Sequence, residues 1–216
     1  MPPPSKNKIF YCKCIVFFLT FLTYAAVHSC RSVWSYSKDN LQNDPEYHFS
    51  TDFFGTCDLV FLLCYSMSLY LFGWVGDKID LRLYLAIGLV GTCTAFGTLG
   101  FMRFSNYRSE PLFAFFMGLN GVFQSVGWPG TIAIMGNWFG PEKRGLIMGI
   151  WAGNPNIGNI IGYEFGSITI DHMHLGYVNL KSFIFQIFFL ELYNNMFDCF
   201  RFGVIDSLVF VCQPLS

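Results

Sequence analysis

Charge is scarce in this chain. Only 12% of the 216 residues are charged, whereas 53% are hydrophobic and phenylalanine alone occurs 26 times. Soluble domains carry about 25% charged residues, so we exclude a soluble globular protein. The formal net charge of −1 provides no basic stripe that would neutralise the phosphates of a nucleic acid. We therefore expect no nucleic-acid partner.

The chain also lacks the residue constellations of an enzyme. It contains no nucleophile elbow, no cluster of metal ligands, no phosphate-binding glycine loop and no pair of carboxylates within one apolar stretch. His172 and His174 come nearest to a metal site, but two histidines without further ligands are typical of a loop. We predict neither enzymatic activity nor a bound metal or cofactor.

Apolar sequence is what the chain has in abundance. Five stretches are long enough to cross about 30 Å of hydrocarbon at about 1.5 Å per residue. They are Ile9–Cys30, Phe53–Gly76, Leu83–Met102, Leu112–Trp138 and Gly145–Tyr163. These stretches predict an all-α, multi-pass membrane protein whose helices are in contact with the lipid bilayer.

The apolar pattern weakens after Tyr163. Residues 164–182 read as a loop, and the apolar region that follows is interrupted by four charged residues, Glu191, Asp198, Arg201 and Asp206. A charge near the centre of a membrane helix costs about 2.5 to 3.5 kcal/mol, so a sixth helix around Phe183–Phe197 is doubtful. We divide the chain into a tail with the start of the first helix (1–14), a half-bundle (15–163) and a divergent tail (164–216).

Lysine and arginine predict the orientation, because they accumulate on the cytosolic side of membrane proteins. With the amino terminus inside, seven basic residues fall on the cytosolic side and four on the other. The seven are Lys6, Lys8, Lys13, Lys78, Arg82, Lys143 and Arg144; the four are Arg31, Lys38, Arg103 and Arg108. This orientation makes residues 32–51 a long outer loop.

The fourth and fifth spans form a predicted hairpin, from Gln124 to Gly162, around a basic loop at residues 141–144. Glycines recur at nearly helical spacing on both sides of it: Gly121, Gly127, Gly130, Gly136, Gly145, Gly149, Gly153, Gly158 and Gly162. Small residues at such spacing let membrane helices approach closely. Pro129 and Pro155 each remove a helix hydrogen bond, which favours kinks there.

Polar side chains inside membrane helices are costly and therefore mark candidate sites. Tyr24, His28 and Arg31 follow one another at steps of four and three residues, so they share one helix face. The guanidinium of Arg31 offers a planar fork of donors that fits phosphate, and this face is a candidate anion site. Alternatively, Arg31 extends toward the lipid headgroups.

Three more polar residues lie within the predicted spans. Asp58 either pairs with an arginine or a helix end inside the bundle, or faces water. Gln124 is a candidate ligand contact, although buried amides more often join helices to one another. Asn154 precedes Pro155 in the fifth span.

The segment GWVGDKIDLR joins the second and third predicted spans. It resembles the signature loop of the major facilitator superfamily at Gly73, Asp77, Lys78 and Arg82, and departs from it at Asp80 and Leu81. The resemblance implies that these four matching residues belong to a gating loop.

The arginine of the first span and further short sequence blocks within residues 15–162 resemble the amino-terminal half of the sugar-phosphate exchangers, a branch of this superfamily. These blocks are Gly55–Asp58, Phe61, Tyr65, Gly76–Lys78, Leu81–Arg82, Gly127–Pro129, Gly136–Gly140, Lys143–Gly145, Met148–Trp151 and Gly158–Asn159. The resemblance implies a twelve-helix fold of two halves. It also implies exchange of an organic phosphate for inorganic phosphate by alternating access, in the endoplasmic reticulum membrane.

Carried over by position, Arg31 would bind phosphate, and Tyr24, His28 and Gln124 would line the same cavity. Two departures bear on this expectation. Ser32 stands where the family commonly has a lysine, and Asn154 with Pro155 occupies the stretch where several relatives place a histidine.

The length of the chain leaves a second hypothesis open. A complete exchanger of this kind needs about twice this length, so we expect a truncated or partial chain. The alternative to a transporter is a non-transporting half-fold, which would pair with a second half-transporter chain, act as a regulatory subunit, or be a fragment without function.

Overall fold

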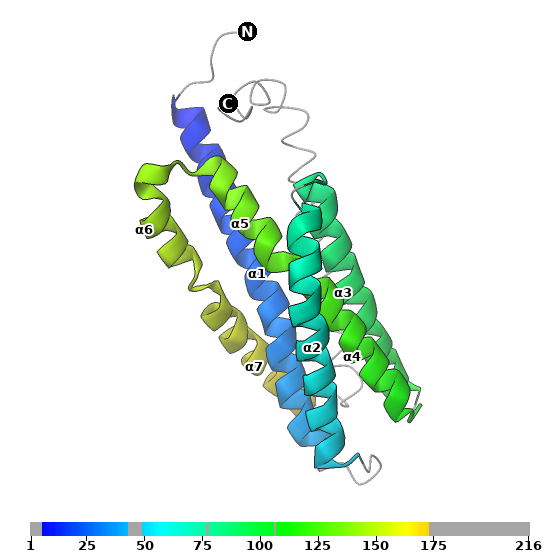
Figure 1. The fold of residues 1–216 in the computed structure, drawn as a ribbon. Helices are drawn as coiled ribbons and strands as arrows, with labels where there is room; N and C mark the ends of the chain where they lie inside the picture. The colour runs from blue at the N-terminus through cyan, green and yellow to red at the C-terminus, as the bar shows by residue number, and fades with distance from the viewer. Residues whose placement is uncertain (1–5, 43–48, 77, 106, 173–216) are drawn as a thin grey trace.

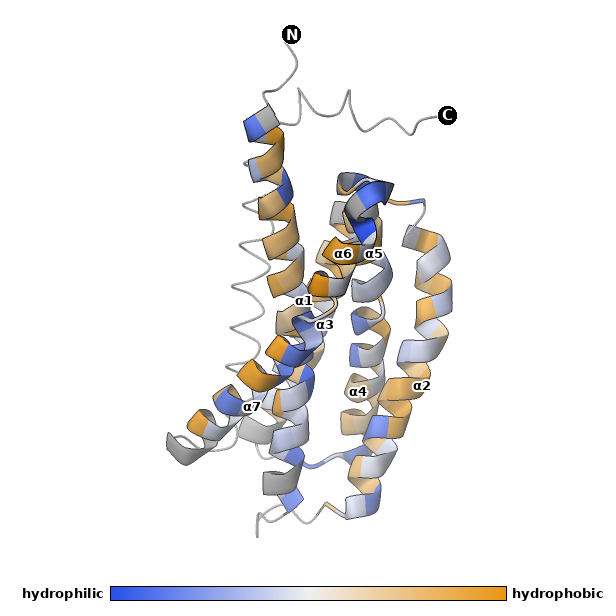
Figure 2. Cartoon of the chain, turned by 90° about the vertical axis from the view of Figure 1, so that its left-hand side faces the viewer, coloured by the Kyte–Doolittle hydropathy of each residue, from blue (hydrophilic) through white to orange (hydrophobic). Residues whose placement is uncertain are grey.

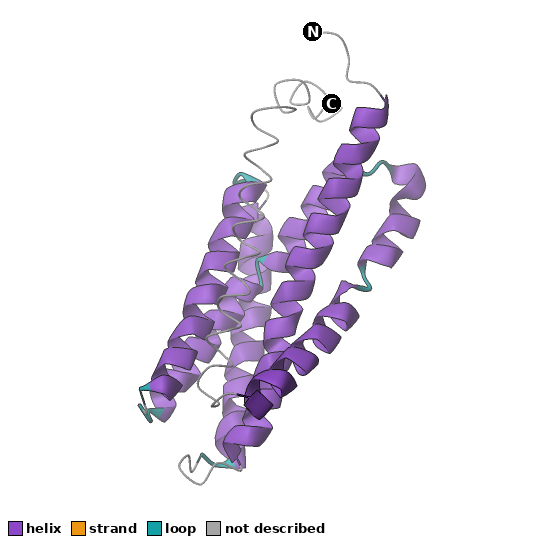
Figure 3. Cartoon of the chain, turned by 180° about the vertical axis from the view of Figure 1, so that it is seen from behind, coloured by secondary structure: helices purple, strands orange, loops and turns teal. Residues whose placement is uncertain are grey.

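The computed structural model describes residues 6–42, 49–76, 78–105 and 107–172, and every regular element in these ranges is an α-helix (Figure 3). The helices are α1 (Lys6–Gln42), α2 (Thr51–Gly76), α3 (Leu81–Phe104), α4 (Glu110–Gln124), α5 (Gly127–Trp138), α6 (Pro141–Trp151) and α7 (Asn154–His172). The all-α prediction is confirmed. The doubtful sixth span around Phe183–Phe197 lies outside the described residues.

Among the described helices, three are long and apolar enough to cross a membrane. Their qualifying segments are Ile9–Lys38 in α1, Thr51–Gly76 in α2 and Leu83–Met102 in α3. The first three predicted spans are therefore confirmed. The predicted outer loop is wrong where it begins, because α1 continues past Ser32 to Gln42, with Val33, Trp34 and Ser37 buried.

The fourth and fifth spans are each divided into two helices. The breaks lie between α4 and α5 and between α6 and α7, a few residues before Pro129 and Pro155. Proline suits the first turn of a helix, because the N–H groups there have no partner within the helix. The kinks expected near these two prolines are therefore present, as full breaks between separate helices. The prediction of a loop from residue 164 is wrong, because α7 continues to His172.

The links between successive spans lie at the two ends of the bundle, whereas the breaks within the fourth and fifth spans lie partway along it (Figure 1). Figure 1 shows the α2–α3 link and the α5–α6 link toward the end where α1 begins, and the α3–α4 link at the opposite end. The basic residues 141–144 are not a loop, because they form the first turn of α6. From there Arg144 donates to the main-chain oxygens of Gly136 (2.8 Å) and Phe139 (3.3 Å), which satisfies the last turn of α5.

The helices pack as α1 against α7, α2 against α4, and α3 against α4 and α5. A Cβ atom added at Gly158 or Gly162 of α7 would overlap the main-chain oxygen of Ala25 or Ser29 in α1. The predicted close approach through small residues is thus confirmed for α7. It is wrong for Gly149 in α6, where an added Cβ would meet nothing within 4 Å.

Large apolar side chains cover the outer surface of the bundle. Figure 2 shows hydrophobic residues along most of α2. Those exposed on this helix are Leu59, Leu62, Leu63, Met67, Tyr70, Leu71 and Trp74. Such a surface is unfavourable in water but matches a hydrocarbon solvent, which supports an integral membrane protein.

Candidate anion-binding site

Arg31 projects from α1 toward two aromatic rings of α2. Its guanidinium carbon lies 4.9 Å from the centroid of the Phe61 ring and 5.5 Å from that of Tyr65. Aromatic faces attract a guanidinium and hold it at low entropic cost, while its N–H donors point outward in its own plane. The charge is therefore held against α2 by packing, without a carboxylate partner among the ion pairs of the described residues.

Arg31 borders a pocket of about 190 Å³ between α1, α2, α3 and α4. The charged and polar residues that line it are Arg31, Ser35, Lys38, Asp58 and Asn120. Pockets for drug-sized ligands start at about 300 Å³, so this one suits a smaller group such as a phosphate. Two cations and one carboxylate leave a formal charge of +1 on the wall, which favours an anion.

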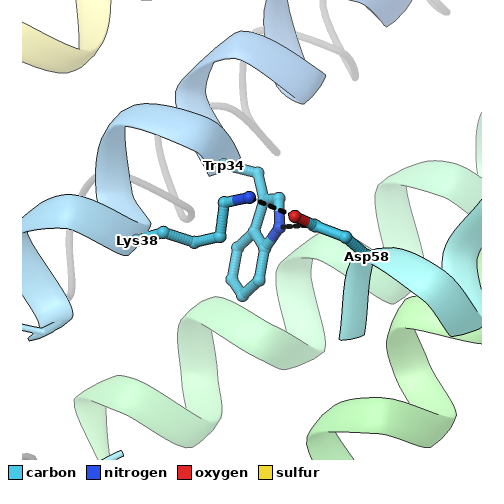
Figure 4. Close-up of polar contacts among 3 residues, drawn as sticks. All are labelled: Trp34, Lys38 and Asp58. Carbon is cyan, nitrogen blue, oxygen red and sulfur yellow. Dashed lines mark hydrogen bonds and ion pairs between the residues drawn. The ribbon is translucent and has the colours of Figure 1, made fainter. Parts of the chain in front are cut away.

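Asp58 is engaged by two side chains of α1. Its Oδ2 atom forms an ion pair with Lys38, and its Oδ1 atom accepts a hydrogen bond from the indole Nε1 of Trp34 at 3.1 Å (Figure 4). Of the alternatives expected for Asp58, the structure shows pairing inside the bundle, and the partner is a lysine and not an arginine. Sequence reasoning missed Lys38 and Trp34 because both were assigned to a loop, although their spacing from Arg31 is helical.

Tyr24 lies at the centre of an aromatic cluster that joins the two broken spans. Its ring stacks on Trp151 at 5.5 Å between centroids and lies 5.8 Å from Trp128 and 5.0 Å from His28. Trp128 is in the first turn of α5, whereas Trp151 ends α6 and donates its Nε1 hydrogen to Thr20 Oγ1 at 3.2 Å. Both breaks are thereby packed against α1 at one point.

Gln124 reaches the Arg31 pocket only through a neighbour. Its Nε2 donates to Oδ1 of Asn120 at 3.1 Å, and Asn120 lines the pocket. The rest of Gln124 is buried and, together with Tyr24, lines a separate cavity of about 20 Å³. Of the four residues expected to share one cavity, the structure places Arg31 at the pocket, Gln124 one hydrogen bond away, and Tyr24 and His28 in the adjoining aromatic cluster.

Residues 10–190 match the sequence model of the Major Facilitator Superfamily. The chain belongs to this superfamily. It is 37% identical over 163 residues to "Putative glycerol-3-phosphate transporter 3" of Arabidopsis thaliana, a match that covers 68% of this chain and 32% of the relative. It is 33% identical over 185 residues to "Sugar phosphate exchanger 3" of Homo sapiens, covering 73% of this chain and 37% of the relative. The chain thus spans about a third of the length of these relatives.

The superfamily's signature loop follows α2. Gly73 lies in the last turn of α2, and Lys78, in the link to α3, places its ammonium 3.6 Å from the centroid of the Trp74 ring. Arg82 belongs to the first turn of α3. Asp77 lies outside the described residues, so its expected gating contact stays a prediction.

Two residues at which this member of the superfamily departs from the expected pattern have structural partners. Ser32 is buried and donates to Oδ1 of Asn159 in α7 at 2.8 Å, so it faces α7 and does not line the Arg31 pocket. Asn154 is completely buried and donates its Nδ2 hydrogen to the main-chain oxygen of Trp151 at 2.7 Å. The side chain of a lysine at position 32 would therefore extend from the interface between α1 and α7, and not from the wall of the Arg31 pocket.

Proposed function

We propose that the described helices bind the phosphate group of a small organic phosphate, within a transporter that exchanges such phosphates for inorganic phosphate by alternating access. The observation that carries the proposal is the position of Arg31, whose guanidinium lies over two aromatic rings at the wall of a phosphate-sized pocket. A guanidinium stays charged at any working pH and binds phosphate through two parallel hydrogen bonds.

The substrate class is proposed from the names of the relatives, which refer to glycerol-3-phosphate and sugar phosphate. Because the chain spans about a third of those proteins, the part proposed for the described helices is the binding of the phosphate group. Exchange across the membrane is proposed for the complete transporter fold. Tyr24, His28 and Gln124 are proposed to support the same site, and Gly73, Asp77, Lys78 and Arg82 to gate it.

The broken spans support a moving structure. Interrupted membrane helices are tolerated where they line a cavity or where neighbours satisfy the freed backbone groups. Here both interruptions meet at the Trp128–Trp151 contact, at 5.9 Å between ring centroids. Alternating access is commonly a rocking motion of helix groups around a fixed site, and the aromatic cluster is a candidate pivot for it.

Binding of inorganic phosphate to the purified chain in lipid nanodiscs tests the proposal. We expect Arg31→Lys to weaken binding at least about tenfold, because a single ammonium cannot reproduce the fork. The matched control is Arg108→Lys, an exposed arginine outside the pocket, which should bind like wild type. Unchanged binding by Arg31→Lys would overturn the role of Arg31.

Absence of phosphate binding by the wild-type chain would favour the alternative function, a non-transporting membrane subunit that pairs with a second half-transporter chain. The endoplasmic reticulum is proposed as the host membrane from the family resemblance alone. Fluorescence co-localisation of the tagged chain with markers of the endoplasmic reticulum and the plasma membrane tests that assignment.

A further inference from the structure

We infer that Lys38 is a second anion-binding residue of the Arg31 pocket, and that Asp58 is its internal competitor: the carboxylate holds Lys38 until a phosphate group displaces it. The inference rests on the proposed function, because it concerns the same pocket. Lys38 is then the first cation that an entering anion meets. Asp58, the one carboxylate among the residues that line this pocket, regulates the availability of Lys38.

The first argument is the arrangement of the three side chains. Lys38 and Trp34 both reach from α1 to Asp58 on α2, one to each carboxylate oxygen (Figure 4). The pair is only partly shielded, since the side chain of Lys38 is 19% exposed and that of Asp58 is 40% exposed. An anion that enters the pocket can therefore reach the ammonium.

The second argument is charge balance. A phosphate group carries about −1.5 to −2 at neutral pH, whereas the pocket lining as it stands has a formal charge of +1 from Arg31, Lys38 and Asp58. Release of Lys38 from Asp58 makes two cations available to one dianion. Ser32 supplies no further cation, because it is uncharged and faces α7.

The third argument is the cost of the exchange. When phosphate replaces the carboxylate at Lys38, one ion pair is traded for another, so little electrostatic energy is lost. Asp58 keeps its hydrogen bond from Trp34 at 3.1 Å after Lys38 leaves. Without that donor, a displaced carboxylate would lose both of the contacts described above, with Lys38 and with Trp34, which costs free energy in a partly buried place. Trp34 is thus a positioning residue for the competitor.

The geometry also sets an order of events. Lys38 follows Arg31 by two helical turns, or about 10 Å along the axis of α1, toward the end of the bundle where α1 ends. An anion that arrives from that end meets Lys38 first and Arg31 second. The flexible four-carbon stem of a lysine allows its ammonium to follow the anion inward.

The other reading of the ion pair is a structural link between α1 and α2. The two readings predict different signs. Loss of either partner from a structural link lowers stability and affects phosphate binding in the same direction. Loss of a competitor tightens phosphate binding, whereas loss of the cation weakens it.

The test measures equilibrium binding of radiolabelled inorganic phosphate to the full chain in nanodiscs. We expect Asp58→Asn to tighten binding about three- to fivefold and Lys38→Gln to weaken it by a similar factor, the range of a partly exposed ion pair. The double variant should bind like Lys38→Gln alone. Asp52→Asn, an exposed aspartate of the same helix, and Lys13→Gln, outside this pocket, are the matched controls and should not change binding.

Weaker or unchanged binding by Asp58→Asn overturns the competitor role. If Asp58→Asn does not fold, the Lys38 variants provide the test. Lys38→Arg should retain phosphate binding and Lys38→Gln should lose it. Retained binding by Lys38→Gln overturns the inference. A further outcome is that Arg31→Lys loses phosphate binding while the Lys38 and Asp58 variants bind as wild type does. That result supports the proposed function and overturns this inference. No binding by wild type removes both.

Discussion

Asn154 donates its side-chain amide to the main-chain oxygen of Trp151 at 2.7 Å. In a continuous helix this oxygen would accept a hydrogen bond from the N–H of residue 155, four positions on, but that residue is a proline and has no such hydrogen. Asn154 supplies the donor that Pro155 lacks. The break between α6 and α7 is thus satisfied internally, in a solvent that offers no hydrogen bonds.

We predict that Asn154→Ala destabilises the protein, because it leaves the buried oxygen of Trp151 without this donor. An unsatisfied buried acceptor costs about 1 to 3 kcal/mol. The loss should appear as a lower midpoint in thermal unfolding monitored by tryptophan fluorescence in detergent. The control is Asn156→Ala, an exposed asparagine of the same turn, and equal midpoints for the two variants would contradict the prediction.

We predict that Gly158→Ala disrupts the contact between α1 and α7. The added methyl group would overlap the main-chain oxygen of Ala25, and backbone cannot rotate away as a side chain can. The measurement is the fraction of monodisperse protein in size-exclusion chromatography, which should fall severalfold. Gly149→Ala adds the same group where nothing lies within 4 Å, and it should leave the profile unchanged.

We predict that Ser32→Lys lowers stability and gives no gain in phosphate binding. Ser32 is buried against α7, where its hydroxyl donates to Asn159 at 2.8 Å, and a lysine there would lose this bond and bury a charge. Ser35→Lys is the informative comparison, because Ser35 lines the Arg31 pocket and an added cation there should tighten phosphate binding. Equal tightening by both variants would show that position 32 also reaches the pocket.

We predict that the ring of Tyr65, and not its hydroxyl, supports Arg31. The ring centroid lies 5.5 Å from the guanidinium carbon, and such an interaction is worth about 0.5 to 1 kcal/mol at a partly exposed site. Tyr65→Leu should therefore weaken phosphate binding about two- to fivefold. Tyr65→Phe keeps the ring and should bind like wild type. A loss of equal size in both variants would assign the effect to the hydroxyl.

Much of the fold could be predicted from local features of the sequence. The first three spans follow from the length and composition of apolar runs, since each must satisfy its backbone within itself across the hydrocarbon. The interruptions near Pro129 and Pro155 follow from the missing N–H of proline. The superfamily was evident from short blocks that include Gly73 and Arg82.

The candidate site was predicted less completely. Helical spacing placed Tyr24, His28 and Arg31 on one face, but it did not indicate Phe61 and Tyr65 as the surface on which Arg31 rests. Lys38 and Trp34 were missed because the end of α1 depends on burial against other helices, which no local pattern reports.

The sequence by itself determined which segments are apolar enough to enter a membrane, where their backbones must break, and which residues carry charge among them. Only the tertiary structure decided the partners. Gly149 and Gly158 belong to the same glycine pattern, yet one meets empty space and the other meets the backbone of Ala25. Likewise, Lys38 and Asp58 lie twenty residues apart on two helices. Their pairing depends on where the bundle places α1 relative to α2, because a contact between helices is set by their relative position and not by the spacing within either one.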